Sequence, residues 1–360
     1  MDALSRQEGT TMPGTLARVW LVRLLVTVVI FGSLSSLPAL DQVKTLGQES
    51  PIPASTPLTG GVLAAWTQIG TDDALHLRAV TARGCPEAII DGSAFSMSVR
   101  AVPTEAFPVT VCEARVPNDA GAIEVSGVAL QGRSADPSRV LVLGDSGCRI
   151  NESVQQACAD PNAWPLARIA DQGAVWRPEL VIHLGDYLYR EMACPEGVAG
   201  CAGSPWGDTW AAWQADFFLP AKPLLESAPW IFVRGNHEAC GRGGDGWFRL
   251  LDPGPYTSEC QEITRPYRVS IGPQVAVVLD ASTARDLEPE SVSTAAYQEH
   301  FAHVASLVGE GGAWLLTHKS FWSLGTDSEG NAIEWTTGTF TQAGFSQPPA
   351  GIDLVLAGHV

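Results

Sequence analysis

The sequence has few basic residues and no tract rich in lysine or arginine. Lys and Arg total 22 against 39 Asp and Glu among 360 residues, which gives a formal net charge of -17. A surface of this charge repels nucleic-acid phosphates, so we expect no general role in binding nucleic acid. A small phosphorylated substrate remains compatible with this charge, because bound metal ions invert the local field.

Two common site motifs are also missing. The chain contains no CxxC pair, which disfavours zinc ribbons and thioredoxin-like redox sites. It contains no GxSxG sequence, which disfavours a serine nucleophile of the α/β-hydrolase kind. Beyond the N-terminal region, no apolar stretch is long enough to span a bilayer.

The N-terminal residues have the order of a secretory signal peptide. Arg18 and Arg23 precede the apolar run Leu24–Phe31, and small residues follow it up to Ala39. The run is too short for a comfortable membrane span, although an uncleaved N-terminal anchor is an alternative. We predict a signal peptide over residues 1–40 and a secreted or periplasmic protein with no stable membrane span after cleavage.

Cysteine usage agrees with export. The chain has eight cysteines, and an even number behind a signal peptide indicates disulfides. Eight cysteines allow about 105 connectivities, of which pairing between sequence neighbours is the simplest. That pairing predicts the bonds Cys85–Cys112, Cys148–Cys158, Cys194–Cys201 and Cys240–Cys260.

Residues 41–137 divide into a linker and a β-rich part. Residues 41–60 are rich in Pro, Ser, Thr and Gly, which is typical of a linker. Residues 61–137 combine short apolar runs with frequent turns and predict a small antiparallel β domain. We expect strands at Val62–Ile69, His76–Thr81, Phe95–Val102, Val109–Val116 and Ala122–Val128. This part has one histidine, His76, and no acidic cluster with ligand spacing, so we expect it to support a neighbouring site.

From residue 138 onward, buried-type strands alternate with helical patterns. Strands are expected at Val140–Leu143, Leu180–Leu184, Trp230–Val233, Val275–Leu279, Ala313–Leu316 and Leu354–Leu356. Helices are expected around Ala163–Gln172, Trp206–Phe218 and Ala295–Val308. The alternation predicts an α/β layered domain over residues 138–360. Tryptophans 206, 210 and 213 belong either to the core or to a substrate-facing wall.

Five of these strands are followed by residues of types that can bind metals. In chain order, these are Asp145; Asp186 and Tyr189; Asn236 and His237; His318; and His359. Open α/β sheets bind ligands at the carboxyl ends of their strands, and carboxylate and phenol oxygens suit a strongly charged ion. Singly, each residue has a structural alternative, such as a helix cap or a turn. Jointly, the pattern indicates a metal centre.

The set resembles the calcineurin-like metallophosphoesterases, and most closely their purple acid phosphatase branch. That branch carries GDxG, GDxxY, GNH(D/E), a lone histidine after a strand, and GHxH. The matching stretches here are Gly144-Asp145-Ser146-Gly147, Gly185-Asp186 with Tyr189, Gly235-Asn236-His237-Glu238, His318 and Gly358-His359. The wider superfamily has a histidine where this chain has Gly147, and Tyr189 takes its place as the mark of the branch. The resemblance implies an α/β/β/α sandwich preceded by a small antiparallel β domain.

The resemblance also implies a dinuclear metal centre. Asp145 and Tyr189 would bind a first metal, expected to be Fe(3+), and Asp186 would bridge both metals. The ligands of the second metal, expected to be Fe(2+), Zn(2+) or Mn(2+), would be Asn236, His318 and His359. His237 would be a catalytic residue that faces the substrate and protonates the leaving alcohol or holds the phosphate.

The sequence departs from the family pattern at its end. The second histidine of GHxH ligates the first metal in the family, and this sequence ends at Val360, one residue before that position. We expect the chain to be C-terminally truncated. We also expect that adding the following residues would restore occupancy of the first metal.

The resulting prediction is metal-dependent hydrolysis of phosphate esters with a metal-bridging hydroxide as the nucleophile. We expect an acid phosphatase-like phosphomonoesterase. One alternative is a phosphodiesterase or nucleotidase with the same metals, and another is a non-catalytic exported binding protein. Arg149 and Arg234 are candidates for phosphate contact, with a surface role as the alternative. The natural substrate and the oligomeric state stay open.

Overall fold

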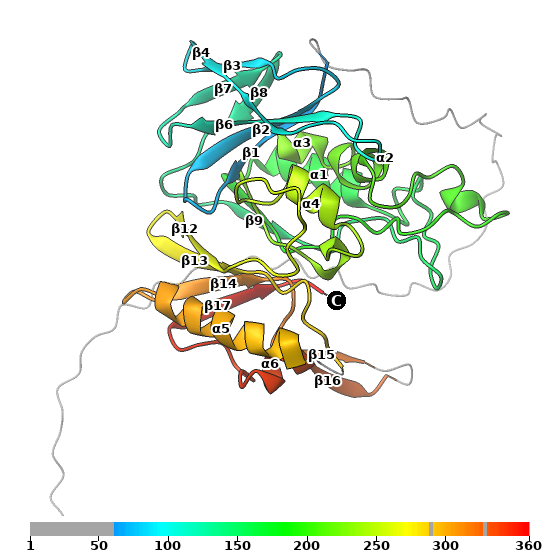
Figure 1. The fold of residues 1–360 in the computed structure, drawn as a ribbon, viewed down its shortest axis with the longest axis vertical. Coiled ribbons are helices and arrows are strands. Elements are labelled where there is room, and N and C mark those ends of the chain that lie inside the picture. Colours follow the sequence, from blue (N-terminus) through cyan, green and yellow to red (C-terminus); the bar gives the residue numbers. More distant parts are fainter. Residues whose placement is uncertain (1–60, 288–290, 327–329, 360) are drawn as a thin grey trace, which may run out of the picture. The chain divides into compact units, whose positions relative to one another are not determined.

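The computed structural model describes residues 61–287, 291–326 and 330–359, and the structural statements below concern these residues (Figure 1). The predicted signal peptide and linker lie outside them. None of the helices described is both long enough and apolar enough to cross a membrane.

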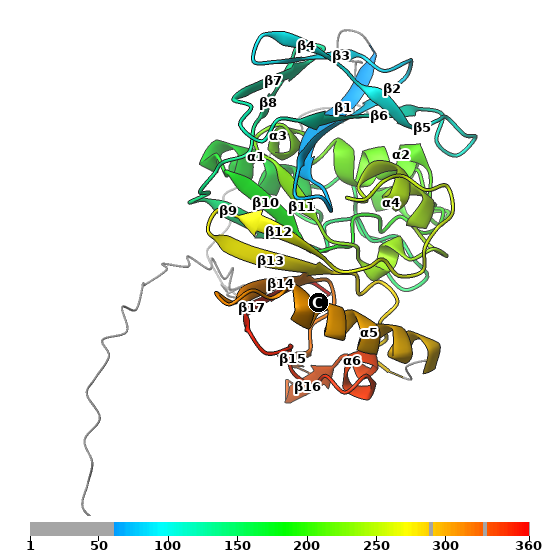
Figure 2. The same ribbon diagram turned by 60° about the vertical axis from the view of Figure 1, so that its left-hand side comes forward.

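Two β-sheets face each other in the structure (Figures 1 and 2). The first has the strand order β5 (Ser98–Ala101), β6 (Thr110–Val116), β2 (Leu75–Thr81), β1 (Val62–Ile69), β11 (Trp230–Phe232), β10 (Leu180–His183) and β9 (Val140–Leu143). The second has the order β12 (Tyr267–Ile271), β13 (Gln274–Leu279), β14 (Ala313–Thr317) and β17 (Ile352–Ala357). Buried aliphatic side chains of both sheets, such as Ile182, Ile231, Val278 and Leu316, form one cluster between them.

Helices cover the outer face of each sheet. On the first sheet these are α1 (Leu166–Trp176), α2 (Trp210–Trp213), α3 (Lys222–Leu225) and α4 (Gly244–Leu250). On the second they are α5 (Ser291–Leu307) and α6 (Gly338–Gln342). Trp210 and Trp213 are buried in the first helical layer, whereas Trp206 is 52% exposed. These layers confirm the predicted α/β/β/α sandwich.

The N-terminal antiparallel strands are present, and four of them, β1, β2, β5 and β6, belong to the first sheet. Strand β1 pairs in parallel with β11, with Gln68 opposite Trp230. The remaining strands form a separate sheet in the order β4 (Ser93–Ser96), β3 (Glu87–Ile90), β7 (Ala122–Val125) and β8 (Val128–Gln131). Because β1 and β11 share a ladder, the domain boundary near residue 137 stays a prediction from sequence pattern.

Two strand predictions in this part are wrong. The strand expected over residues 95–102 is divided into β4 and β5, and β3 was not predicted. The strand expected over residues 122–128 is a hairpin, β7 and β8. Its turn residues Ser126 and Gly127 have φ values of 51° and 83°, a conformation that reverses the chain in a tight hairpin.

All eight cysteines form disulfides, and the pairing is the one between sequence neighbours. The prediction for Cys85–Cys112, Cys148–Cys158, Cys194–Cys201 and Cys240–Cys260 is confirmed. Such a disulfide content is compatible with export to an oxidising compartment.

A small fourth sheet, β15 (Trp322–Thr326) and β16 (Ala332–Thr336), follows β14. Single-turn helices occupy Ala199–Cys201 and Asn236–Glu238, and a π-helical turn occupies Gln214–Phe218. The turn Asn236–Glu238 lies shortly after β11 and belongs to the site described next.

Candidate metal centre

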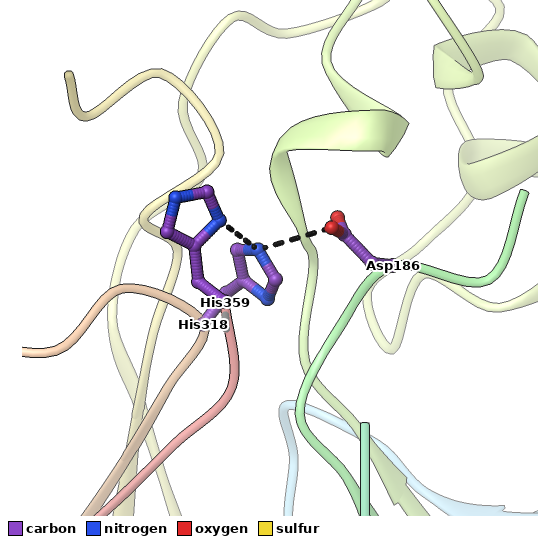
Figure 3. A group of neighbouring side chains, drawn as sticks. All are labelled: Asp186, His318 and His359. Carbon is purple, nitrogen blue, oxygen red and sulfur yellow. Dashed lines mark hydrogen bonds and ion pairs between the residues drawn. The ribbon is translucent and has the colours of Figure 1, made fainter. Parts of the chain in front are cut away.

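The predicted site residues follow strands whose carboxyl ends meet at one edge of the sandwich. Strands β9, β10 and β11 are parallel neighbours, as are β13, β14 and β17. The loops after β9 and β10 carry Asp145 and Asp186, and those after β14 and β17 carry His318 and His359. Figure 3 shows the side chains of Asp186, His318 and His359 converging from separate loops. The parallel strands thus bring distant residues into contact. For example, the His359 N–H donates to Asp145 Oδ2, although the two residues are 214 positions apart.

The three oxygen donors predicted for the first metal, from Asp145, Asp186 and Tyr189, lie close together. The Tyr189 hydroxyl lies 2.7 Å from Asp186 Oδ2 and 3.0 Å from Asp145 Oδ1. Burial raises the pKa of the Tyr189 phenol far above its usual value, and the two carboxylates raise it further. Burial also raises the pKa of the Asp145 carboxyl. A cation between these oxygens would offset the cost of their negative charge, so this donor set fits a highly charged metal ion.

The donors predicted for the second metal, the Asn236 amide oxygen and the imidazoles of His318 and His359, also lie close together. His318 Nε2 lies 2.9 Å from Asn236 Oδ1 and 3.2 Å from His359 Nδ1. His318 Nδ1 is 2.7 Å from the Leu184 carbonyl, to which it donates its proton. That hydrogen bond leaves the lone pair of Nε2 directed at the cluster, as in metal-binding histidines. This donor set fits a divalent ion such as Zn(2+), Fe(2+) or Mn(2+).

Asp186 is common to both sides. Its Oδ2 lies 3.4 Å from His318 Nε2, and potential ligand atoms of Asp186, His318 and His359 all lie within 4.8 Å of one another. Burial alone would raise the pKa of Asp186, but the neighbouring imidazoles of His318 and His237 hold that pKa far below its usual value. An ionised Asp186, whose Oδ2 lies near both donor sets, is suited to bridge two cations.

The backbone is strained at three of the proposed ligands. Asp145, Asp186 and His359 have φ values of 50°, 64° and 61°, in the left-handed region that L-residues rarely adopt. Gly185 has a φ of 98°, and a Cβ there would lie 2.7 Å from His318 Nδ1. A Cβ on Gly235 would lie 2.2 Å from Asp186 Oδ1. The Gly-Asp and Gly-Asn pairs therefore reflect how closely the loops approach each other.

A buried carboxylate, Glu238, ties two of these loops together. Its Oε1 accepts hydrogen bonds from the N–H groups of Tyr187 and Leu188 at 2.8 and 3.2 Å. Its Oε2 accepts from those of Asp186 and Gly235 at 3.0 and 3.1 Å. From the sequence, Glu238 was named only as the last residue of the Gly235–Glu238 motif. The structure shows that its carboxylate holds the two loops together.

A second buried carboxylate, Asp216, holds the loops of Asp145 and Tyr189. Its Oδ2 accepts from the Tyr189 N–H at 2.7 Å, and its Oδ1 accepts from the Cys148 N–H and Arg190 Nε, both at 2.8 Å. Sequence reasoning missed Asp216, because it lies in a helical segment far from the residues that it contacts.

His237 lies at the margin of the donor cluster. Its ring stacks on Tyr189 with centroids 3.8 Å apart, and its Nε2 is 3.8 Å from Asp186 Oδ2. Its Nδ1 lies 3.2 Å from Glu191 Oε1. The imidazole is therefore close to the centre, with Nε2 toward Asp186 and Nδ1 toward Glu191.

The two arginines proposed for phosphate contact differ in position. The Arg149 guanidinium lies 4.9 Å from the Tyr189 ring centroid, and both residues line a pocket of about 400 Å³ with Asp145. Arg234 is 2% exposed and pairs with Asp280 at 3.2 Å. The structure does not bring Arg234 to the centre, because its guanidinium is engaged inside the protein.

Among the solved structures that resemble the chain are two at low sequence identity. One, described as the structure of PhoD, has 14% identity and a TM-score of 0.45, covering 82% of this chain and 69% of its own. The other is a purple acid phosphatase from yellow lupin (Lupinus luteus) seeds, with 15% identity and a TM-score of 0.43. That match covers 83% of this chain and 58% of the lupin chain. No curated protein sequence matches.

The family model of calcineurin-like phosphoesterases matches residues 138–360, which is more than half of the chain. The matched region contains every strand end that contributes to the candidate centre. The chain belongs to the calcineurin-like phosphoesterase family.

Proposed function

We propose that this phosphoester hydrolase is an acid phosphatase-like phosphomonoesterase that works with two metal ions. The observation that carries the proposal is the position of Asp186 between two donor sets. Its Oδ2 meets the Tyr189 hydroxyl, which also contacts Asp145, and the same atom lies 3.4 Å from His318 Nε2. A shared carboxylate between an oxygen-rich set and a nitrogen-rich set suits two different cations.

Asp145, Tyr189 and Asp186 would hold the first ion, and their hard anionic oxygens favour Fe(3+). The second ion, Fe(2+), Zn(2+) or Mn(2+), would be held by Asp186, Asn236, His318 and His359. Bound ions of this kind neutralise charge on phosphoryl oxygens and lower the pKa of coordinated water toward neutrality.

His237 is proposed to donate a proton to the leaving alcohol. Its ring lies against Tyr189, with Glu191 3.2 Å from Nδ1 and the proposed bridging carboxylate of Asp186 3.8 Å from Nε2. General acid catalysis by a positioned side chain contributes about 10²–10⁴-fold to rate. We expect His237→Ala to lower kcat within that range while metal content stays unchanged. Loss of metal in that variant would instead make His237 a ligand.

The test of this function loads the protein with iron plus zinc or manganese. Hydrolysis of a chromogenic phosphomonoester and a phosphodiester is measured side by side, with Asp186→Asn as the control. Monoester turnover that disappears in Asp186→Asn supports the proposal, and preference for the diester would indicate a phosphodiesterase. Visible absorbance of an Fe(3+)–tyrosinate pair, lost in Tyr189→Phe, reports the first metal independently of activity.

A further inference from the structure

A guanidinium outside the family motifs lies beside His237. Arg242 Nη2 is 2.8 Å from His237 Nδ1 and 2.9 Å from His237 Nε2. We propose that Arg242 binds the non-bridging oxygens of the substrate phosphate and gives the site its preference for monoesters over diesters. This inference rests on the phosphatase function proposed above.

Arg242 is held in place before any substrate binds. Its Nε donates to Glu191 Oε1 at 2.7 Å, and Nη2 contacts the same oxygen. Its Nη1 donates to the Asn236 carbonyl at 3.2 Å. The guanidinium therefore bridges the loop after β10 to the turn after β11, so its direction is fixed relative to a proposed ligand and the proposed acid.

The loop that carries Arg242 is itself anchored. The disulfide Cys240–Cys260 crosses its base, and both sulfurs lie within 3.7 Å of Arg234 Nη2. The Gly243 N–H donates to the His237 carbonyl at 2.9 Å. A fixed loop reduces the conformational entropy lost when the guanidinium binds a ligand, which favours its use in recognition.

Arg242 lies beside His237 with part of its side chain open to solvent. Arginine stays protonated, and its planar guanidinium presents several N–H donors in a fixed arrangement. Glu191 Oε1 accepts from Nε and Nη2, and a phosphate oxygen next to the guanidinium is the acceptor that a substrate would add.

Exposure distinguishes Arg242 from a nearby lysine. The Lys319 side chain is 4% exposed, and its Nζ lies 2.8 Å from Asp286 Oδ2 and 2.6 Å from His359 Nε2. The Arg242 side chain is 35% exposed, so it is accessible to a ligand from solvent. In a chain with a net charge of -17, such a cation also attracts a dianionic substrate to an acidic region.

The preference for monoesters follows from the number of free oxygens. A monoester dianion keeps three non-bridging oxygens, whereas a diester carries a second carbon substituent on one of them. A planar guanidinium pairs best with two oxygens at once. If two oxygens face the metals, only the monoester offers Arg242 a further anionic oxygen.

The test compares Arg242→Gln and Arg242→Lys with wild type at full metal loading. Hydrogen bonds to charged groups predict a rise of about 10- to 100-fold in the monoester KM for Arg242→Gln, with a much smaller change for the diester. Arg242→Lys is expected to recover part of the loss. The control is Arg139→Gln, because Arg139 is 44% exposed and faces Glu179 before β9, at the opposite end of that strand. It is expected to match wild type.

Equal losses on both esters, or a fall in kcat alone, would overturn the inference and leave Arg242 as a positioning residue. Binding of inorganic phosphate to the metal-loaded protein, measured by calorimetry, separates this inference from the proposed function. If wild type hydrolyses neither ester, the phosphatase proposal fails, and weaker phosphate binding by Arg242→Gln would still support the anion site. Unchanged phosphate affinity in that variant would refute the site itself.

Discussion

Replacing Glu238 with glutamine exchanges one oxygen for an amide nitrogen and is expected to disable the candidate centre. Each carboxylate oxygen of Glu238 accepts two backbone N–H groups, from Tyr187 and Leu188 on one side and Asp186 and Gly235 on the other. Whichever way the new amide is oriented, its NH₂ group faces one of these pairs. Two buried backbone donors then lose their acceptor and meet another donor.

The cost follows from the burial of this carboxylate, which is fully enclosed. A hydrogen bond to a charged group contributes about 1.5–3 kcal/mol, so losing two is expected to cost about 3–6 kcal/mol of unfolding free energy. Burial, and then the charge of Asp186, raise the pKa of Glu238 to about 7. The comparison therefore belongs at pH 8, where the wild-type carboxylate is ionised.

Denaturant unfolding followed by tryptophan fluorescence gives the stability change, and zinc competition with a chelator gives the metal affinity. Glu179→Gln is the matched control, because Glu179 Oε2 also accepts two backbone N–H groups, from Ser138 and Arg139, but its side chain is 29% exposed. Water can replace those bonds, so we expect a loss below about 1 kcal/mol. If Glu238→Gln cost no more than this and bound zinc normally, the proposed positioning role would be refuted.

Three further predictions concern other parts of the chain. Asp286 Oδ2 lies 3.0 Å from His359 Nε2, so Asp286→Asn is expected to weaken zinc binding about 10- to 100-fold in a chelator competition, and an unchanged affinity would contradict this role. Arg100 donates to four backbone carbonyls at residues 248, 249, 252 and 254, so Arg100→Met is expected to cost at least about 3 kcal/mol in denaturant unfolding. Burial lowers the pKa of His183 from 6.5 to about 3, so its neutral form stabilises the fold fully above pH 6.5 and this contribution is lost as pH falls toward 3. Across that window His183→Gln is expected to lower the pH slope of stability by up to about 1.4 kcal/mol per unit, and an unchanged slope would show that the imidazole is protonated in the fold.

The candidate ligands could be predicted because each one follows a strand of continuous apolar residues. The four residues of β10 are buried throughout, as in strands covered on both faces, and the polar residues after Leu184 then mark the end of the strand. The glycine before Asp186 adds a second signal, since a side chain at residue 185 would collide with His318. Local sequence thus carries both the position of the turn and the identity of the ligand.

Residues that position the ligands could not be found in this way. Asp216 contacts Cys148 across 68 positions, and Arg100 reaches carbonyls within and just after α4 from about 150 positions away. An aspartate in a helical segment and an arginine in a strand carry no local mark of such partners. The role of Arg100 depends on the pairing of β1 with β11, which places the N-terminal strands beside the helices of the α/β region.

The pairing of β1 with β11 suggests how the N-terminal strands could support the site, as expected from the sequence. Arg78 in β2 donates to the Leu250 carbonyl at 2.8 Å, and Arg100 in β5 donates to the Phe248 carbonyl at 2.9 Å. Both acceptors lie in the last turn of α4, whose first residue comes two positions after Arg242. Fixing the end of this helix restrains the loop at its start, and this loop carries the proposed anion-binding guanidinium. We infer that the N-terminal strands support the candidate site through α4.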